Sequence, residues 1–353
     1  MPAEIVVVGS GMITPVGLST KETAASTRAR IARLTSIEWR DSRFQPYTVG
    51  IVPDDALNPL QPDLENLPLT YREGRMLRLA EIALLEALSA LPKSAGAVPL
   101  LLGLPEIHTT LPIKEPEFLG RLARQSGAAL DLARSTAIPR GRASGLHALR
   151  EACERLEQGK ATFALAGGVD TYVDLYILGT LDLQKRIRNE VNPDGFGPGE
   201  GAGFLLLTTG DMAKKHGMTV LARVVANASG KEEGHIYSEV PYKGEGLPAA
   251  FEALFSAKSD LPAIDCIYSS FNGEHYWAKE FGVALVRNRE HFLDPYQMEH
   301  PAECFGDLGA AHGIVMAGLA VAGLQRTKKK TPTLIFASSD YGDRAVTVLA
   351  GAA

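Results

Sequence analysis

The chain is poor in cysteine, with only Cys153, Cys266 and Cys304 among 353 residues. Thiols so few and so widely spaced exclude a disulfide framework and a zinc site built on cysteine. We therefore expect no bound metal, and the reduced thiols indicate a protein of the cytoplasm. An excess of charge is lacking too: the net charge is only -5, so no nucleic-acid partner is expected.

Long hydrophobic runs are also absent. The longest run of small apolar residues, 313–324, is too short to span a bilayer. Residues 1–8 lack the basic start of a signal peptide and are typical of a strand, so no membrane association is expected. The glycines at 9–11 lack the third glycine of a dinucleotide-binding turn, because Thr-Pro stands at 14–15. We expect no cofactor.

What is present is one order of elements that occurs twice. The expected elements are a helix at 76–88 and strands at 98–102, 163–166 and 203–207, then a helix at 247–255 and strands at 265–268, 334–337 and 345–349. Alternating helices and apolar strands predict α/β layers whose sheets are covered on both faces. We expect two halves, 1–213 and 218–353, joined near residues 214–217.

Three segments carry a resemblance to a known family. Residues 141–148 (Gly-Arg-Ala-Ser-Gly-Leu-His-Ala) stand at the start of an amphipathic helical pattern, 166–170 (Ala-Gly-Gly-Val-Asp) end a strand, and 194–203 form a dense glycine cluster. With them the chain resembles the β-ketoacyl synthases, or 3-oxoacyl-ACP synthases, of the thiolase-like superfamily. The resemblance implies an α/β thiolase-like fold, in which two duplicated halves form a five-layer α-β-α-β-α sandwich.

The same resemblance implies a Cys-His-His catalytic set that this chain lacks. The nucleophilic cysteine of the family would stand at Arg142, whose side chain stays protonated and offers no nucleophile. The histidine positions hold Ser270 and Gly306, and a shift of one residue would place Phe271 at the first. The loop 339–344 lacks the glycine-rich gate of the family. We expect no catalytic residue of the family type.

Arg142 needs a charged partner. A cation at a helix N-terminus opposes the helix dipole, so we expect a carboxylate beside it, either Glu200 or Asp307. The arginine would then either plug the acyl site by this internal pairing or hold an anionic ligand.

Other residues are candidates for binding or for a relocated nucleophile. The candidates for binding a substrate are Arg142, Phe196, Phe271 and Tyr341. Ser144 is a fallback nucleophile, with helix capping as its alternative role. Cys304 is a second fallback, with His312 close in sequence, and His275 follows the first lost histidine position.

These residues leave three functions open. The first is a catalytically inactive β-ketoacyl-synthase-like scaffold or partner subunit, similar to the chain-length factors that pair with active condensing enzymes. The second is an adaptor or chaperone of a bacterial effector-secretion cluster. The third is a divergent acyltransferase that uses Ser144 or Cys304.

The resemblance also implies partners. It predicts a homodimer, or a heterodimer with a related subunit, whose interface strand would be 163–166. A further protein partner could be an acyl carrier protein, an active synthase or a secreted effector. The region 104–138 is shorter than in typical condensing enzymes, so the acyl pocket and dimer surface that it helps to build are expected to differ here.

Overall fold

A computed structural model describes residues 3–107, 112–327 and 331–352 of the chain. Its strands are β1 (Ile5–Ile13), β2 (Thr35–Arg40), β3 (Pro46–Val49), β4 (Leu100–Leu104), β5 (Thr136–Pro139), β6 (Phe163–Thr171), β7 (Glu200–Thr209), β8 (Ala222–Lys231), β9 (Ile264–Ser269), β10 (Phe292–Glu299), β11 (Thr333–Ser338) and β12 (Asp343–Gly351). Its helices are α1 (Thr20–Arg28), α2 (Pro62–Glu65), α3 (Tyr71–Leu88), α4 (Glu115–Ser126), α5 (Ser144–Glu157), α6 (Leu175–Leu183), α7 (Gly210–Lys215), α8 (Gly246–Ala257), α9 (His275–Arg287), α10 (Ala302–Phe305) and α11 (His312–Thr327). Every helix and strand expected from the sequence overlaps one of these elements.

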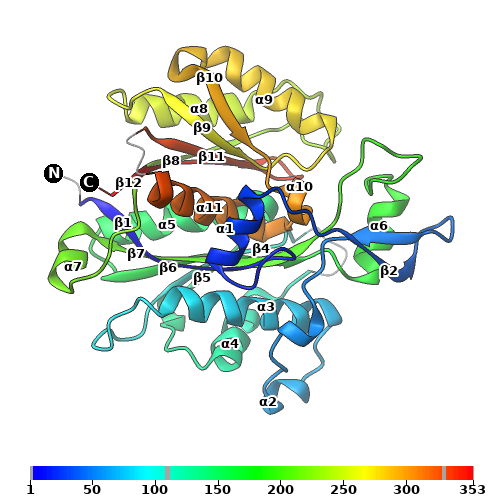
Figure 1. Cartoon of the computed structure of the whole chain (residues 1–353), viewed down its shortest axis with the longest axis horizontal. Helices are drawn as coiled ribbons and strands as arrows, with labels where there is room; N and C mark the ends of the chain where they lie inside the picture. The colour runs from blue at the N-terminus through cyan, green and yellow to red at the C-terminus, as the bar shows by residue number, and fades with distance from the viewer. Residues whose placement is uncertain (1–2, 108–111, 328–330, 353) are drawn as a thin grey trace.

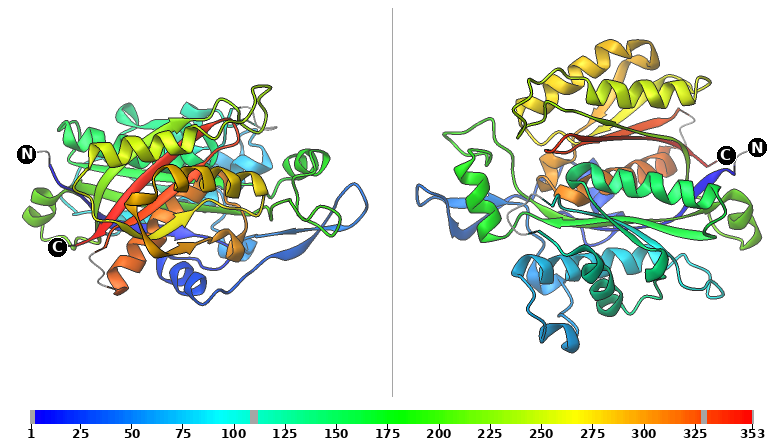
Figure 2. Two further views of the ribbon diagram at one scale, coloured as in Figure 1. Left: turned by 90° about the horizontal axis from the view of Figure 1, so that it is seen from above. Right: turned by 180° about the vertical axis from the view of Figure 1, so that it is seen from behind.

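The elements are stacked in alternating layers of helices and strands (Figure 1). Helices α8 and α9 cover one outer face, α3 and α4 cover the other, and α5 and α11 lie between two layers of strands. The view from behind shows the same order (Figure 2). The expected α/β sandwich of the thiolase-like class is therefore confirmed.

Ten strands form one hydrogen-bonded sheet in the order β10-β9-β11-β12-β8-β1-β7-β6-β4-β5. The two ends of this sheet repeat one arrangement. Strand β9 runs parallel to β10 and β11, as β4 runs parallel to β5 and β6. The pairs β11–β12 and β12–β8 are antiparallel, as are β6–β7 and β7–β1. The duplication expected from the sequence is present in both strand order and strand direction.

The two half-sheets meet at a short junction. Strands β1 and β8 pair only where Ile5, Val6 and Val7 face Val224, Arg223 and Ala222. The resemblance implies two sheets, and the structure instead joins them through this junction into one continuous sheet. The sheet folds back on itself, so that its halves face each other across α5 and α11 (Figure 1).

Close packing of α5 on α11 forms the centre of the molecule. A Cβ atom on Gly145 would lie 2.9 Å from the Cβ of Ile314, so the helices touch where α5 has no side chain. Leu149 of α5 and Met316 of α11 are fully buried in one apolar cluster. Helix α11 is apolar on nearly all sides because strands lie above and below it. This packing fixes the position of the turn that precedes α5.

The prediction that residues 163–166 form the strand at a subunit interface is wrong. Residues 163–166 belong to β6, which pairs with β4 on one side and β7 on the other. A strand with ladder partners on both sides has no free edge for another subunit. Among the described strands of this half-sheet, the outer edge is β5, which pairs with β4 alone. Apolar sequence alone does not distinguish an interior strand from an edge strand.

A hairpin of β2 and β3 extends from the body beside α6 (Figure 2). The Asp182 carboxylate of α6 accepts a hydrogen bond of 2.9 Å from the backbone N–H of Ser42 in the hairpin. Three large apolar side chains are exposed here: Phe44 at 78%, Tyr176 at 71% and Leu183 at 81%. They form what we call the arm patch.

In the described part of the region 104–138, the α-helix α4 packs on α3. Its residues 108–111 lie outside the described part of the chain. Among the residues that are described, no helix has both the length and the apolar character needed to cross a membrane.

Candidate functional site

Arg142 lies where the resemblance places the nucleophilic cysteine. A 3-10 turn, Gly141–Ala143, leads directly into α5, and Ser144 begins the helix. The turn packs against β11 and against the turn that precedes α11. The Arg142 side chain is therefore only 2% exposed.

Two carboxylates and an indole ring enclose the Arg142 guanidinium. Its Nη1 lies 3.0 Å from Asp307 Oδ2, and its Nη2 lies 2.7 Å from Asp340 Oδ1. Its central carbon lies 4.0 Å from the ring centroid of Trp277, within cation–π distance. Although burial opposes the charged form, Asp307 and then Asp340 raise the pKa of Arg142 above its usual value. Asp307 is thus confirmed as a carboxylate partner.

Glu200 is not the partner of Arg142, and that alternative is wrong. Its carboxylate accepts two bonds of 2.6 Å from Arg75 of α3. It also accepts hydrogen bonds from the backbone N–H of Val52 and the hydroxyl of Thr171. These four bonds satisfy both oxygens of Glu200 at the start of β7.

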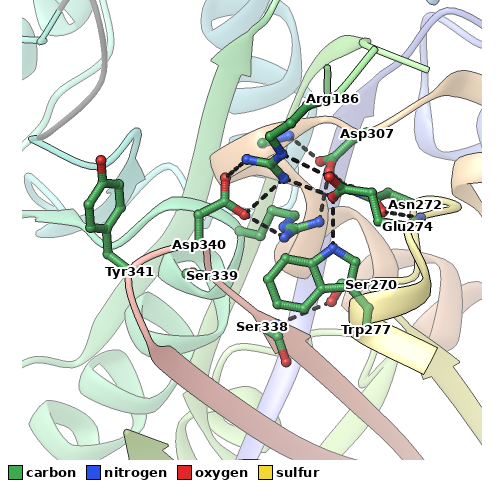
Figure 3. Close-up of polar contacts among 12 residues, drawn as sticks. Arg186, Ser270, Asn272, Glu274, Trp277, Asp307, Ser338, Ser339, Asp340 and Tyr341 are labelled. Atoms are coloured by element: carbon green, nitrogen blue, oxygen red, sulfur yellow. Dashed lines mark hydrogen bonds and ion pairs between the residues drawn. The ribbon is translucent and has the colours of Figure 1, made fainter. Parts of the chain in front are cut away.

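A second arginine completes the network. Arg186 Nε and Nη2 bond the Glu274 carboxylate at 2.8 and 2.7 Å, and its Nη1 lies 2.5 Å from Asp340 Oδ2. Figure 3 shows Arg186 between Asp340 and Glu274, with Trp277 below Glu274. The Trp277 Nε1–H donates a hydrogen bond of 3.0 Å to Glu274 Oε2. We call Arg142, Arg186, Glu274, Asp307 and Asp340 the charge network.

The sequence analysis missed Arg186, Glu274 and Asp340 as site residues. They come from three separate segments, and no motif or spacing relates them to Arg142. Asp307 was accessible to sequence reasoning because it follows Gly306, a position that the resemblance singles out. Asp340 lies in the loop 339–344, for which the sequence indicated only that the glycine-rich gate of the family is missing.

The two expected histidine positions carry no base. Ser270 Oγ accepts the backbone N–H of Ser338 at 3.1 Å. Gly306 has φ 81°, and a Cβ atom there would lie 2.7 Å from the carbonyl oxygen of Gly197. This position therefore favours glycine over a histidine. Asn272 donates a hydrogen bond of 2.9 Å to Asp307, so an amide contacts the network here.

His312 lies near the charge network but is held in its neutral form. Its Nδ1 accepts the backbone N–H of Leu308 at 3.2 Å, and burial lowers the pKa of His312 to about 4. His275 is far more exposed and contacts Asp194 on the surface.

Ser144 is buried and lacks a basic partner among the described contacts. Its hydroxyl donates to the carbonyl oxygen of Gly141 at 2.5 Å, and the carbonyl of Ala310 lies at 3.4 Å. A carbonyl oxygen can accept a hydrogen bond from the hydroxyl, but it is not a base that could deprotonate it. Nor does this hydroxyl cap the helix, because capping requires it to accept an N–H.

Cys304 is also buried. It packs in an apolar cluster with Met12 and Leu319. Burial raises the pKa of the Cys304 thiol, whereas a nucleophilic cysteine needs a lowered pKa.

A cavity that opens to solvent lies beside the charge network. Arg142 and Tyr341, two of the residues predicted to bind a substrate, line it. Phe196 is instead buried below Arg186, whose guanidinium carbon lies 5.3 Å from the ring centroid. Phe271 stacks on His300 outside the cavity lining. Phe196 and Phe271 therefore do not line this cavity, and their role in binding a substrate stays a prediction.

The pKa values of two carboxyl groups in this cavity are shifted in opposite directions. Burial and then the neighbouring Asp340 raise the pKa of Glu106 to about 8. Although burial opposes it, Arg186 and then Arg142 lower the pKa of Asp340 to about 2. At neutral pH Glu106 is mostly protonated, whereas Asp340 is ionised. Within the described ranges, no group of histidine, cysteine and acidic residues is arranged to hold a metal ion.

Trp277→Phe is expected to lower the free energy of unfolding by about 1–2 kcal/mol. The substitution removes the hydrogen bond to Glu274 and weakens the cation–π contact with Arg142. Urea denaturation followed by circular dichroism measures the change. Trp39→Phe is the matched control, because Trp39 lies half-buried on β2, and its substitution should cost below about 0.5 kcal/mol. Equal effects of the two variants would contradict the prediction.

Comparison with known sequences gives two matches. Residues 133–213 match the family model for the N-terminal domain of β-ketoacyl synthase. The 3-oxoacyl-[acyl-carrier-protein] synthase 2 of Mycobacterium leprae (strain TN) is 25% identical over 215 residues. That alignment spans 56% of this chain and only 50% of the relative.

Solved structures match over essentially the whole chain. A type II polyketide ketosynthase, solved with its acyl carrier protein and bound to a hexaketide, has a TM-score of 0.76 and 17% identity, with full coverage of both chains. The ishigamide ketosynthase/chain length factor has a TM-score of 0.78 and 17% identity, again with full coverage. The ketosynthase from module 6 of the bacillaene synthase of Bacillus subtilis 168 has a TM-score of 0.79 and 14% identity, and covers 99% of this chain and 72% of its own.

Proposed function

We propose that this β-ketoacyl-synthase-like protein, which is related to fatty-acid and polyketide condensing enzymes, performs no condensation and serves as a scaffold or partner subunit. One observation carries the proposal: the start of α5 holds Arg142, with its guanidinium between Asp307 and Asp340. An acyl-enzyme intermediate needs a nucleophile at this place, and a guanidinium cannot supply one.

The surrounding residues support the same proposal. The resemblance places the histidines of the family at Ser270 and Gly306, and neither residue can polarise a thioester carbonyl or assist loss of carbon dioxide. Ser144 donates its hydroxyl to a carbonyl, and the thiol of Cys304 has a raised pKa. A relocated nucleophile is therefore the less favoured function.

The pairing of Arg142 favours an internal plug over an anion-binding site. Both terminal nitrogens of the guanidinium face carboxylates, and Trp277 covers its plane. An incoming anion would have to displace Asp307 or Asp340 and then remain beside the displaced carboxylate. We propose that Arg142 plugs the place where the acyl group of the family would be attached.

The surface supports a protein partner. The arm patch exposes Phe44, Tyr176 and Leu183 on two elements that are joined by the hydrogen bond between Ser42 and Asp182, and exposed apolar patches mark interaction sites. We propose that the chain pairs through the free edge of β5 with a second copy or a related subunit. The arm patch would then be available to an acyl carrier protein, an active synthase or a secreted effector. Because its cysteines are too few and too widely spaced for a disulfide framework, we propose that the protein is cytoplasmic.

Incubation with acyl-CoA and acyl-carrier-protein thioesters, followed by intact-protein mass spectrometry, tests the loss of catalysis. We expect no covalent acyl adduct on the folded protein, because none of the described residues that line the cavity is an activated nucleophile. Ser144→Ala and Cys304→Ala are the matched variants. An adduct that disappears in either variant would overturn the proposal and establish an acyltransferase with a relocated nucleophile. Native spectra of the same samples report the number of subunits.

A further inference from the structure

The cavity beside the charge network has three distinct walls. Ile177 and Leu181 of α6 form an apolar wall. Tyr237 and Tyr341 form an aromatic wall, with their rings stacked at a centroid distance of 4.8 Å. Glu106, which follows β4, provides a carboxyl group that is 8% exposed. Tyr341 lies on the side of Asp340 away from Trp277 (Figure 3).

The charge network contains more negative than positive charge. Two guanidiniums, Arg142 and Arg186, pair with three carboxylates, those of Glu274, Asp307 and Asp340. The only other arginine in the cavity lining, Arg72, pairs with Asp170 at 2.8 Å. Within the described residues, the network and cavity therefore carry one net negative charge even when Glu106 is protonated. Buried charge of one sign favours a counter-ion.

Glu106 is the carboxyl group that such a counter-ion would meet. Its Oε1 accepts the backbone N–H of Tyr341 at 3.1 Å, and within residues 3–107, 112–327 and 331–352 no cation forms an ion pair with it. The charged groups that act on it are Asp340 and Asp343, which raise its pKa, and Arg142, which lowers it. Asp343 is itself paired with Arg140 and Lys231.

We propose that this cavity binds an alkylammonium group, with its nitrogen at the Glu106 carboxylate and its alkyl stem along Ile177 and Leu181. The rings of Tyr237 and Tyr341 add cation–π attraction for the ammonium. The apolar wall suits a chain of methylene groups, which a bare metal ion or a short polar cation does not have. The ligand is either the side chain of a lysine in a partner polypeptide or a free primary amine. This inference does not depend on the loss of condensation.

Binding of the ammonium is coupled to release of a proton. Below the pKa of Glu106 the carboxyl is protonated, so an arriving ammonium replaces the proton, which passes to the buffer. The affinity therefore rises with pH until Glu106 is ionised in the free protein. It falls only at much higher pH, where the amine itself loses its charge near pKa about 10.

Calorimetric titration of the whole chain tests the inference with two probes, n-butylamine and Nα-acetyl-lysine N-methylamide. The neutral analogues n-butanol and Nα-acetyl-norleucine N-methylamide are the matched ligand controls. We expect the affinity of a binding amine to rise about tenfold or more between about pH 6.5 and about pH 8.5. Titration in two buffers of different ionisation enthalpy counts the proton that is released.

Glu106→Gln supplies the decisive variant, because it has the shape of the protonated side chain and should fold. It should weaken amine binding about tenfold or more and remove its pH dependence, whereas Glu290→Gln, at an exposed site, should change neither. Binding of the lysine derivative alone identifies a polypeptide source, and binding of butylamine identifies a free amine. Failure of both amines to bind, equal binding of the neutral analogues, or unchanged binding to Glu106→Gln would each overturn the inference.

Discussion

Arg142→Ala is expected to lower the free energy of unfolding by about 3–5 kcal/mol. The substitution leaves Asp307 without its ion pair at a site that is 1% exposed, and Asp340 keeps only Arg186. Removing one member of a buried ion pair is costly because the remaining charge stays out of water. Urea denaturation at neutral pH, followed by circular dichroism, measures the loss.

Two further variants distinguish the loss of the buried ion pairs of Arg142 from the general effect of truncating an arginine side chain. Arg150→Ala removes an exposed pair with Glu154 and should cost below about 1 kcal/mol. Adding Asp307→Asn to Arg142→Ala should recover part of the stability, because the unpaired charge is then gone. Two results would show that the arginine does not stabilise the carboxylates. One is a loss of stability in Arg142→Ala no larger than that in Arg150→Ala. The other is a loss in the double variant equal to the sum of the losses caused by Arg142→Ala and Asp307→Asn alone.

Glu106→Gln is expected to raise the free energy of unfolding by about 2–4 kcal/mol near pH 8. Burial, with Asp340 nearby, raises the pKa of Glu106 to about 8 in the folded chain, whereas an unfolded glutamate titrates near about 4.3. The unfolded chain therefore releases this proton first. The contribution of Glu106 to stability is complete below about pH 4.3 and is lost as the pH rises towards about 8.

The measurement is the difference in stability between the native chain and Glu106→Gln over this range of pH. The two should be similar near pH 4.3 and diverge progressively up to pH 8, with the glutamine variant more stable. Glu290→Gln should follow the native chain throughout, because its side chain is 71% exposed. Parallel curves for the native chain and Glu106→Gln would show that Glu106 ionises normally in the folded state.

Local sequence pattern predicted part of the fold, but not the β2–β3 hairpin, β8, β10 or α9. The apolar periodicity at 76–88 predicted α3, but the helix begins at Tyr71, because the Thr70 hydroxyl accepts the backbone N–H of Glu73 and caps it earlier. The pattern at 163–166 correctly predicted a strand. The pattern does not reveal which strands pair with this one, because strand pairing joins segments that are distant in the sequence. The subunit interface was therefore predicted on a strand that lies inside the sheet.

The candidate site was predictable only where a single segment defines it. Arg142 and Asp307 each lie at or beside a position that the family resemblance fixes, and both occupy the charge network. Arg186 and Glu274 are brought there by the stacking of the two halves, which no local spacing reveals. Phe196 lies beside the correct glycine cluster, but its ring is 1% exposed and packs beneath Arg186 rather than in the cavity.

The charge network also connects the two halves of the molecule through ion pairs. Both guanidiniums come from the chain before β8, and all three carboxylates come from the chain after it. The backbone junction of β1 with β8 is only three residue pairs long. If the halves moved apart at this face, one would expose uncompensated cations and the other uncompensated anions. If the chain were divided between β7 and β8, the two polypeptides would thus present complementary charges, which would attract and orient them during reassembly.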